Sequence, residues 1–296
     1  MRMSGRRVNV RAQNHNMIAE HVFPWPGLSD LPDLPDLVDA HCHLQDGFLR
    51  HGLEPALIRA RAAGVRMMCC NGTHEGDWGY VLGLGRSHAD ICVSLGLHPW
   101  YVGERGPNWL MRLEELVAAH RVGIGEIGLD NALPERNDGE QEEVFLAQME
   151  LAVRYGRPVT IHCRKAFGRM VDLIGAMKER PPYMMLHAYA GSHEMVPVFE
   201  KLGFHISMCA SITRTANRKA RTACVRISPE RLLVESDSPA IAPVGVDFER
   251  NEPAYLPMVV EVLAQLRGER PEEVAERTAA NAREFFRCCA EVGSGA

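Results

Sequence analysis

Six side chains that could bind a metal ion stand at the ends of short apolar segments. In chain order they are His41, His43, Glu126, His162, His187 and Asp237. Imidazole nitrogens and carboxylate oxygens together form a mixed donor set, which suits zinc, manganese, cobalt or magnesium better than the all-oxygen cage that calcium prefers. The sequence therefore predicts a divalent-metal site and leaves the identity of the metal open.

Strand periodicity is the physical reason to treat these residues as a set. Side chains two positions apart on a strand point to the same side, so His41 and His43 would share a face with Asp39. Glu126 would likewise share a face with Ile124. The same spacing places His162 on one face with Thr160, and Asp237 on one face with Glu235, and each segment thus ends in a candidate ligand.

Each candidate ligand also has an ordinary structural explanation. Histidines are often satisfied core residues, Asp237 could cap a turn before Pro239, and Glu126 could form a buried salt bridge. A carboxylate in a strand is expensive to bury unless it is paired, hydrogen-bonded or bound to metal. The joint pattern favours the metal site.

The elements that must position these residues alternate between strand-like and helix-like segments. Strands are predicted at residues 37–41, 65–70, 91–96, 122–126, 158–162, 184–187, 204–208 and 231–236. Helical patterns occupy Leu53 to Ala63, Gln141 to Tyr155 and Ala166 to Lys178, and two further helices, 252–267 and 271–286, would close the domain. Eight βα units predict a TIM-type (β/α)8 barrel, with a doubly wound open sheet as the alternative. The barrel is preferred because all six ligands lie at strand carboxyl ends, where barrel active sites assemble.

Composition sets outer limits on organisation and location. Residues 1–36 are predicted to form a flexible, arginine-rich extension that ends in a proline-rich linker, and residues 37–296 are predicted to form the barrel. The nine cysteines, without any C-x-x-C pair, predict buried reduced thiols in a cytoplasmic, reducing compartment; the arginine-rich start offers organelle targeting as an alternative. No apolar stretch suits a membrane span. The net charge of −5 gives no sign of a generally basic nucleic-acid-binding surface.

Seven segments of the chain carry a family resemblance. They are Val38 to Leu44, Gly96 to Pro99, Gly125 to Asp130, Ile161 to Ala166, Glu235 to Pro239, Asn251 to Pro253 and Thr278 to Ala282. Together they resemble TatD-type metal-dependent hydrolases of the amidohydrolase superfamily, over most of the chain after the linker. One departure is the segment His187 to Gly191, which reads HAYAG where the family often has HCF[ST]G.

The resemblance implies a barrel that holds up to two divalent cations. It places His41, His43 and Asp237 at one cation, His162 and His187 at the other, and Glu126 between them. It also implies phosphodiester hydrolysis, usually of DNA. Two cations can stabilise the attacking and leaving oxygens of such a displacement, so we assign Glu126 and Asp237 to catalysis and expect Asp237 to relay a proton.

Substrate contacts are predicted from two residues beside the ligands. Arg164 follows His162 and could grip a phosphate through its guanidinium, although a salt-bridged surface arginine is nearly as good an explanation. His98 could contact substrate from the end of the third strand or be structural. Trp100 or Tyr101 could stack on a base, or simply pack.

Three functions remain open from the sequence. A metal-dependent deoxyribonuclease with a DNA substrate leads, because the ligand set is complete and the family resemblance implies this activity. A small-molecule amidohydrolase or esterase on the same barrel is the second, since fold does not fix substrate. A non-catalytic interaction protein is the third. The oligomeric state is not predicted.

Overall fold

Eight parallel strands, hydrogen-bonded in chain order, organise the computed structural model, which describes residues 34–247 and 250–289. Every predicted strand is present. The strands are β1 (Leu37–Cys42), β2 (Val65–Asn71), β3 (Ile91–Leu95), β4 (Gly123–Asp130), β5 (Val159–Arg164), β6 (Met184–Leu186), β7 (Phe204–Met208) and β8 (Leu232–Val234). The consecutive order excludes a doubly wound sheet, in which the strand order reverses at a switch point. The predicted TIM-type barrel is confirmed.

The ring closes between β1 and β8 near their carboxyl ends. The Asp237 amide donates to the His41 carbonyl oxygen at 3.0 Å, and the His43 amide donates to the Ser238 carbonyl oxygen at 2.8 Å. Below them the buried Asp39 carboxylate accepts the Ser236 hydroxyl at 2.5 Å and the Ser236 amide at 2.9 Å. These bonds hold the segments that carry three predicted ligands against each other.

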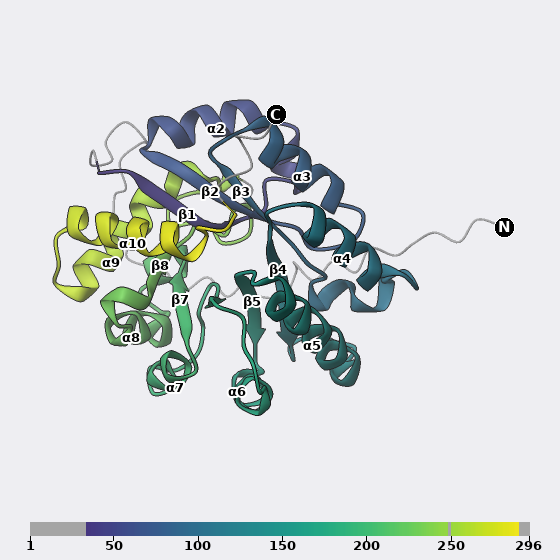
Figure 1. Cartoon of the computed structure of the whole chain (residues 1–296). Helices are drawn as coiled ribbons and strands as arrows, with labels where there is room; N and C mark the ends of the chain where they lie inside the picture. Colours follow the sequence, from purple (N-terminus) through teal and green to yellow (C-terminus); the bar gives the residue numbers. More distant parts are fainter. Residues whose placement is uncertain (1–33, 248–249, 290–296) are drawn as a thin grey trace.

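Helices encircle the strands in Figure 1, as the alternating sequence pattern predicts. They are α1 (Gly47–Arg50), α2 (Leu53–Ala62), α3 (Trp78–Ser87), α4 (Trp109–Ala119), α5 (Asp138–Tyr155), α6 (Phe167–Ala176), α7 (Val196–Lys201), α8 (Arg218–Arg226), α9 (Leu256–Arg267) and α10 (Pro271–Phe285). The predicted helix at 252–267 was too long. Its start is the 3-10 turn η7 (Pro253–Tyr255), because Pro253 lacks an amide donor and disfavours helical backbone at the residue before it.

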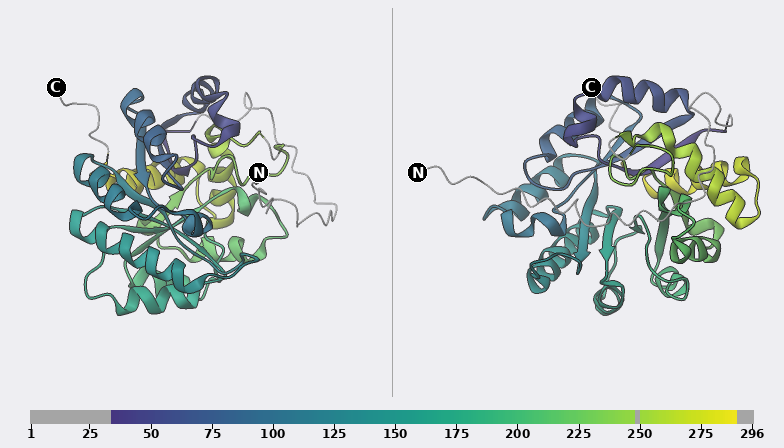
Figure 2. Two further views of the ribbon diagram at one scale, coloured as in Figure 1. Left: turned by 90° about the vertical axis from the view of Figure 1, so that its right-hand side faces the viewer. Right: turned by 180° about the vertical axis from the view of Figure 1, so that it is seen from behind.

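The closing helix α10 packs against β1 and β8, and the views of Figures 1 and 2 agree on this placement. Phe285 and Phe286 join a buried cluster with Val38, Cys69 and Leu233 from the strands. This apolar packing supports the barrel away from the strand carboxyl ends. The nine cysteines are free thiols, seven of them buried and two partly buried.

The start of the chain bears on three predictions. β1 begins at Leu37, where the barrel was predicted to begin, and Leu34 is already buried. The rest of the predicted flexible extension, residues 1–33, lies outside the described residues, as does the arginine-rich segment behind the targeting alternative. None of the helices formed by the described residues is long and apolar enough to cross a membrane.

Candidate metal centre

The Glu126 carboxylate is the point on which the predicted ligands converge. It lies within β4, which runs on to Asp130 instead of ending at Glu126 as the sequence suggested, and the residue is only 2% exposed. Five imidazoles surround its two oxygens. Oε1 lies 2.7 Å from His187 Nε2, 3.1 Å from His162 Nδ1 and 3.2 Å from His98 Nε2, and Oε2 lies 3.2 Å from His43 Nε2 and 3.4 Å from His41 Nε2.

Asp237 completes the cluster from the loop after β8. Its Oδ1 lies 3.7 Å from His41 Nε2 and 3.9 Å from His43 Nε2, and those two nitrogens are 3.0 Å apart. Asp237 has a positive φ of 46°, as do Ala188 and Lys165 (φ 41° and 54°) after β6 and β5. Positive φ is uncommon outside glycine and concentrates at functional sites. At these three strand ends the chain turns sharply, directly beside the ligands.

The spacing of these atoms fits divalent metal. Nitrogen and oxygen ligands about 2.0–2.2 Å from one ion lie roughly 3–3.6 Å from each other, close to the separations measured here. Three groups of side chains have ligand atoms close enough to hold an ion: His41 with His43 and Asp237, His41 with Glu126 and His187, and His98 with Glu126 and His162. All six predicted ligands are thus brought together, and Glu126 is shared between groups.

The second ring nitrogens show which atoms face the cluster. His43 Nδ1 lies 2.9 Å from the Asn71 carbonyl oxygen, and His162 Nε2 lies 3.2 Å from Asp130 Oδ2. Each of these nitrogens carries the proton of the neutral ring, because its partner accepts, so loss of the second proton leaves a lone pair on the nitrogen that faces the cluster. Such an arrangement is typical of metal-binding histidines.

His98 has the opposite arrangement. Its Nδ1 accepts the Trp100 amide at 3.1 Å, which leaves the proton of the neutral ring on Nε2, the nitrogen that faces Glu126. Burial lowers the pKa of His98 to about 4, which keeps the ring neutral. His98 is 4% exposed, so it lies inside the cluster. This geometry makes it a donor to Glu126.

The cluster divides its charge unevenly. Burial alone would lower the pKa of His43, but Glu126 and Asp237 raise it to about 9. Burial lowers the pKa of His41 to about 4. Burial also raises the pKa of Asp237 to about 7, against the attraction of His187. Without metal, protons on some imidazoles therefore balance the buried carboxylates.

Glycines let β4 approach its neighbours closely. Gly128 has a φ of 144°, and a Cβ there would overlap the backbone carbonyl of His162 on β5. A Cβ on Gly125 would lie 2.8 Å from the Thr160 Cβ. Only glycine has no side chain to clash at such approaches. The glycines around Glu126 thus bring its carboxylate and His162 together.

Sequence reasoning left supporting residues without a role. Asp130 Oδ2 holds His162, and Glu235 Oε1 lies 3.4 Å from His187 Nδ1. Both residues are fully buried. A signal was available, because Asp130 and Glu235 have the same strand parity as Glu126 and Asp237.

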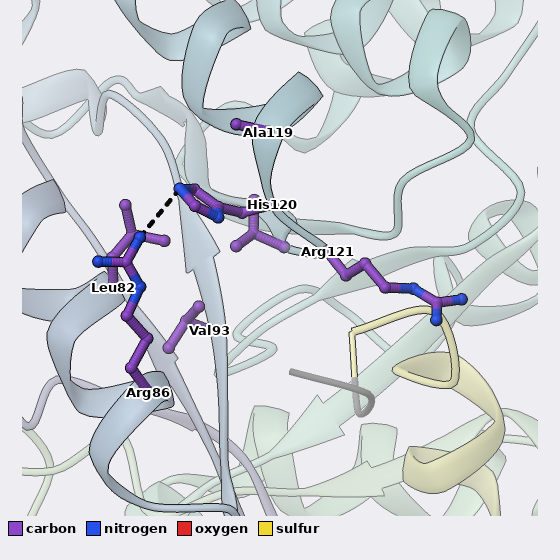
Figure 3. A pocket seen from close by; sticks show the side chains of 7 residues that line it. Leu82, Arg86, Val93, Ala119, His120 and Arg121 are labelled. Carbon is purple, nitrogen blue, oxygen red and sulfur yellow. Dashed lines mark hydrogen bonds between the residues drawn. The ribbon is translucent and has the colours of Figure 1, made fainter. Parts of the chain in front are cut away.

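Arg164 lies at the rim, as its predicted substrate role requires. Its side chain is 49% exposed and its Nη1 is 4.0 Å from Asp130 Oδ2. A cavity of about 180 Å³ lies elsewhere, between α3, α4 and the start of β4, and contains no predicted site residue. Figure 3 shows Arg86 directed at His120 there, 3.2 Å apart, and Arg121 pointing away. The strand carboxyl ends therefore remain the candidate site.

A parallel eight-stranded barrel with a buried histidine and carboxylate cluster at its carboxyl end defines the class of TIM-barrel metal-dependent hydrolases. A family model described as TatD related DNase matches residues 38–287. The chain belongs to this TatD family. This confirms the resemblance found in the sequence.

The match with curated relatives spans nearly the whole length of each relative. The "3'-5' ssDNA/RNA exonuclease TatD" of Edwardsiella piscicida is 31% identical over 258 residues, which is 85% of this chain and 99% of the relative. The protein of the same name from Erwinia tasmaniensis is 32% identical over 240 residues, covering 79% of this chain and 93% of the relative.

Solved structures give the same fold. The TatD homologue YJJV from Escherichia coli K12 superimposes with a TM-score of 0.81 at 27% identity, covering 85% of this chain and 98% of that one. A TatD family hydrolase from Entamoeba histolytica has a TM-score of 0.76 at 18% identity, covering 85% and 98%. The second likeness bears on the fold alone.

Proposed function

We propose that the protein is a metal-dependent phosphodiester hydrolase that removes nucleotides from single-stranded DNA. The observation that carries this proposal is the Glu126 carboxylate with five imidazoles and Asp237 around it, at the end of the barrel where active sites assemble. The names of the relatives, ssDNA/RNA exonucleases, support single-stranded nucleic acid as the substrate and leave RNA as a second one.

The residues fit up to two divalent cations of the zinc, manganese, cobalt or magnesium class. We assign His41, His43 and Asp237 to one ion and His162 and His187 to the other, with Glu126 between them. Bound ions of this kind lower the pKa of water and offset the charge that develops on a phosphodiester. In their neutral forms His43 and His162 keep the proton on the nitrogen that faces away from the cluster, which leaves the other nitrogen for a cation and supports this assignment.

The chain's own side chains supply orientation, charge and proton transfer. Asp237 would take the proton of the attacking water on its carboxylate, as a positioned general base does. His98, with its Nε2 proton facing Glu126 Oε1 at 3.2 Å, would fix the carboxylate. Arg164, half exposed at the rim, would bind a phosphate oxygen of the strand through its guanidinium.

The test is cleavage of an end-labelled single-stranded DNA oligonucleotide under a panel of divalent metals and with EDTA. We expect metal-dependent cleavage, a ladder shortening one nucleotide at a time, and loss of activity in Asp237→Asn. The exposed Asp172→Asn on α6 is a matched control that should leave activity unchanged. Asp237→Asn with full activity and bound metal would contradict the role of Asp237.

A parallel set of substrates tests the second function. An RNA strand of the same sequence, a cyclic amide and a lactone are assayed with the same metal-loaded protein. Preference for the cyclic amide or lactone over both oligonucleotides would replace the nuclease by a small-molecule amidohydrolase or esterase. No bound metal at neutral pH would favour the non-catalytic protein.

A further inference from the structure

Trp100 is an exposed aromatic residue at the rim of the candidate site. It follows His98 in the 3-10 helix η3 (Pro99–Glu104) and is 47% exposed. The other exposed large apolar residues of the described chain lie on helices: Phe48 on α1, Ile58 on α2, Met111 on α4, Val198 on α7 and Val225 on α8. Single exposed apolar residues there need no explanation. A tryptophan exposed beside a candidate catalytic cluster calls for one.

The indole is held in place although half of it is exposed. Its Nε1 donates to Asp130 Oδ2 at 2.7 Å, and its ring lies 4.9 Å from the His98 ring at an interplanar angle of 84°. Its contact with the His162 ring, at 6.3 Å, is also nearly perpendicular. Among the described residues no ring stacks parallel to this indole. A fixed ring with an unstacked face loses little conformational freedom when a flat group binds.

One carboxylate oxygen connects this indole to the candidate metal centre and to the Arg164 guanidinium. Asp130 Oδ2 lies 3.2 Å from His162 Nε2 and 4.0 Å from Arg164 Nη1, besides its bond to the indole. Gln141 on α5 fixes the backbone of Asp130 by accepting its amide at 2.8 Å. The exposed ring, the exposed guanidinium and a predicted metal ligand are therefore all set by one buried group.

We propose that Trp100 is the base-stacking platform of the substrate site, holding one unpaired base while Arg164 holds the adjoining phosphate. This inference rests on the proposed nuclease function and names the part of the substrate that the site recognises. Base–aromatic stacking tolerates every base, since each has a π-face. A paired base inside a duplex has both faces covered by its neighbours, so the platform selects single strands.

The test combines two tryptophan variants with oligonucleotides that lack one base. Wild type, Trp100→Ala, Trp100→Phe and the exposed control Met111→Ala are assayed on a DNA 12-mer. They are also assayed on versions carrying a single abasic site at each of the four nucleotides nearest the cleaved end. Circular dichroism melting confirms that the variants are folded.

We expect Trp100→Ala to raise KM about 5- to 150-fold with kcat changed less than about threefold, the range of one stacked base. Trp100→Phe keeps a flat ring and loses the indole donor, so it should restore most of the affinity. At one abasic position the wild type should lose affinity by about the factor that Trp100→Ala loses on the intact strand. At that position Trp100→Ala should show no further loss compared with its own affinity for the intact strand.

Three results would overturn the platform. Equal losses in Trp100→Ala and Trp100→Phe would show that the indole acts only through its bond to Asp130. A fall in kcat with unchanged KM would show that Trp100 positions His162 instead of the substrate. If the loss of affinity from Trp100→Ala and the loss from an abasic site simply add at every position, no base rests on the ring.

A binding measurement separates this inference from the proposed function. Fluorescence anisotropy of a labelled oligonucleotide is followed on metal-free protein, where stacking does not require catalysis. If wild type cleaves nothing but binds the strand more tightly than Trp100→Ala, the nuclease fails and the platform stands. If wild type binds no single strands and also cleaves none when loaded with metal, both fail.

Discussion

Metal loading should release protons, because metal competes with protons for the same lone pairs. At pH 7 His43, with a pKa of about 9, carries its proton almost fully, and His187, whose pKa Glu126 raises well above the ordinary value, carries one too. Asp237, with a pKa of about 7, is half protonated. His41, with a pKa of about 4, has none to release. The pKa of His162 is raised as well, by its hydrogen bonds to Asp130 and Glu126, so this ligand adds part of a further proton. The expected release is about 2.5 to 3.5 protons when the centre fills.

The direction of the pH dependence of metal binding follows from the competition between protons and the cation. Lowering the pH adds protons that the cation must displace, so the overall binding constant should fall by at least about 100-fold per pH unit between pH 8 and pH 6. Isothermal titration calorimetry with manganese, in buffers of different ionisation enthalpy at one pH, counts the protons directly. The slope of the logarithm of the binding constant against pH gives the same number independently.

Glu126→Gln tests whether the Glu126 carboxylate is the cause of the proton release. The substitution removes the carboxylate that raises the pKa of His43 and His187, so the variant should bind metal more weakly and release fewer protons. The exposed Glu150→Gln on α5 is the control. Release of less than one proton by the wild type, or equal release by wild type and Glu126→Gln, would refute the reasoning.

Three further predictions concern stability and local geometry. Gly128→Ala, which forces a Cβ against the His162 carbonyl, should lower the free energy of unfolding by about 3 kcal/mol and weaken metal binding, whereas Gly139→Ala, in open space, should do neither; urea titration and calorimetry measure both. His205→Phe should make the free energy of unfolding less sensitive to acid. Burial lowers the pKa of His205 to about 4, so the unfolded chain takes up this proton first, and the wild type loses up to about 3 kcal/mol of stability as the pH falls from 6.5 to 4. Equal urea midpoints for both proteins at pH 7 and at pH 4.5 would contradict this. Arg59→Ala leaves the buried Glu252 carboxylate without its two hydrogen bonds of 2.6 and 2.5 Å and should lower the free energy of unfolding by about 2 kcal/mol, with exposed Arg66→Ala as control.

Strand parity explains how much of the fold and the site the sequence could predict. Alternating apolar positions locate each strand, and a parallel barrel brings all carboxyl ends to one face. His41, Glu126 and His162 could therefore be grouped before any distance was known. The strand boundaries were harder to predict from the sequence. β4 continues to Asp130 because Gly128 lets it pair beside His162, and this contact joins segments 34 positions apart in the chain.

The ring nitrogens mark where such reasoning ends. Whether a histidine presents a lone pair or a proton depends on the group behind it, and that group comes from another strand. Asp130 behind His162 turns Nδ1 into a potential ligand atom, while the Trp100 amide behind His98 turns Nε2 into a donor. Two histidines at the carboxyl ends of β3 and β5 thus differ in chemistry. The predicted contact of His98 with substrate stays a prediction, whereas its role as a donor to Glu126 can be tested by substitution. His98→Gln, which retains a donor, should keep more activity than His98→Ala at equal metal occupancy.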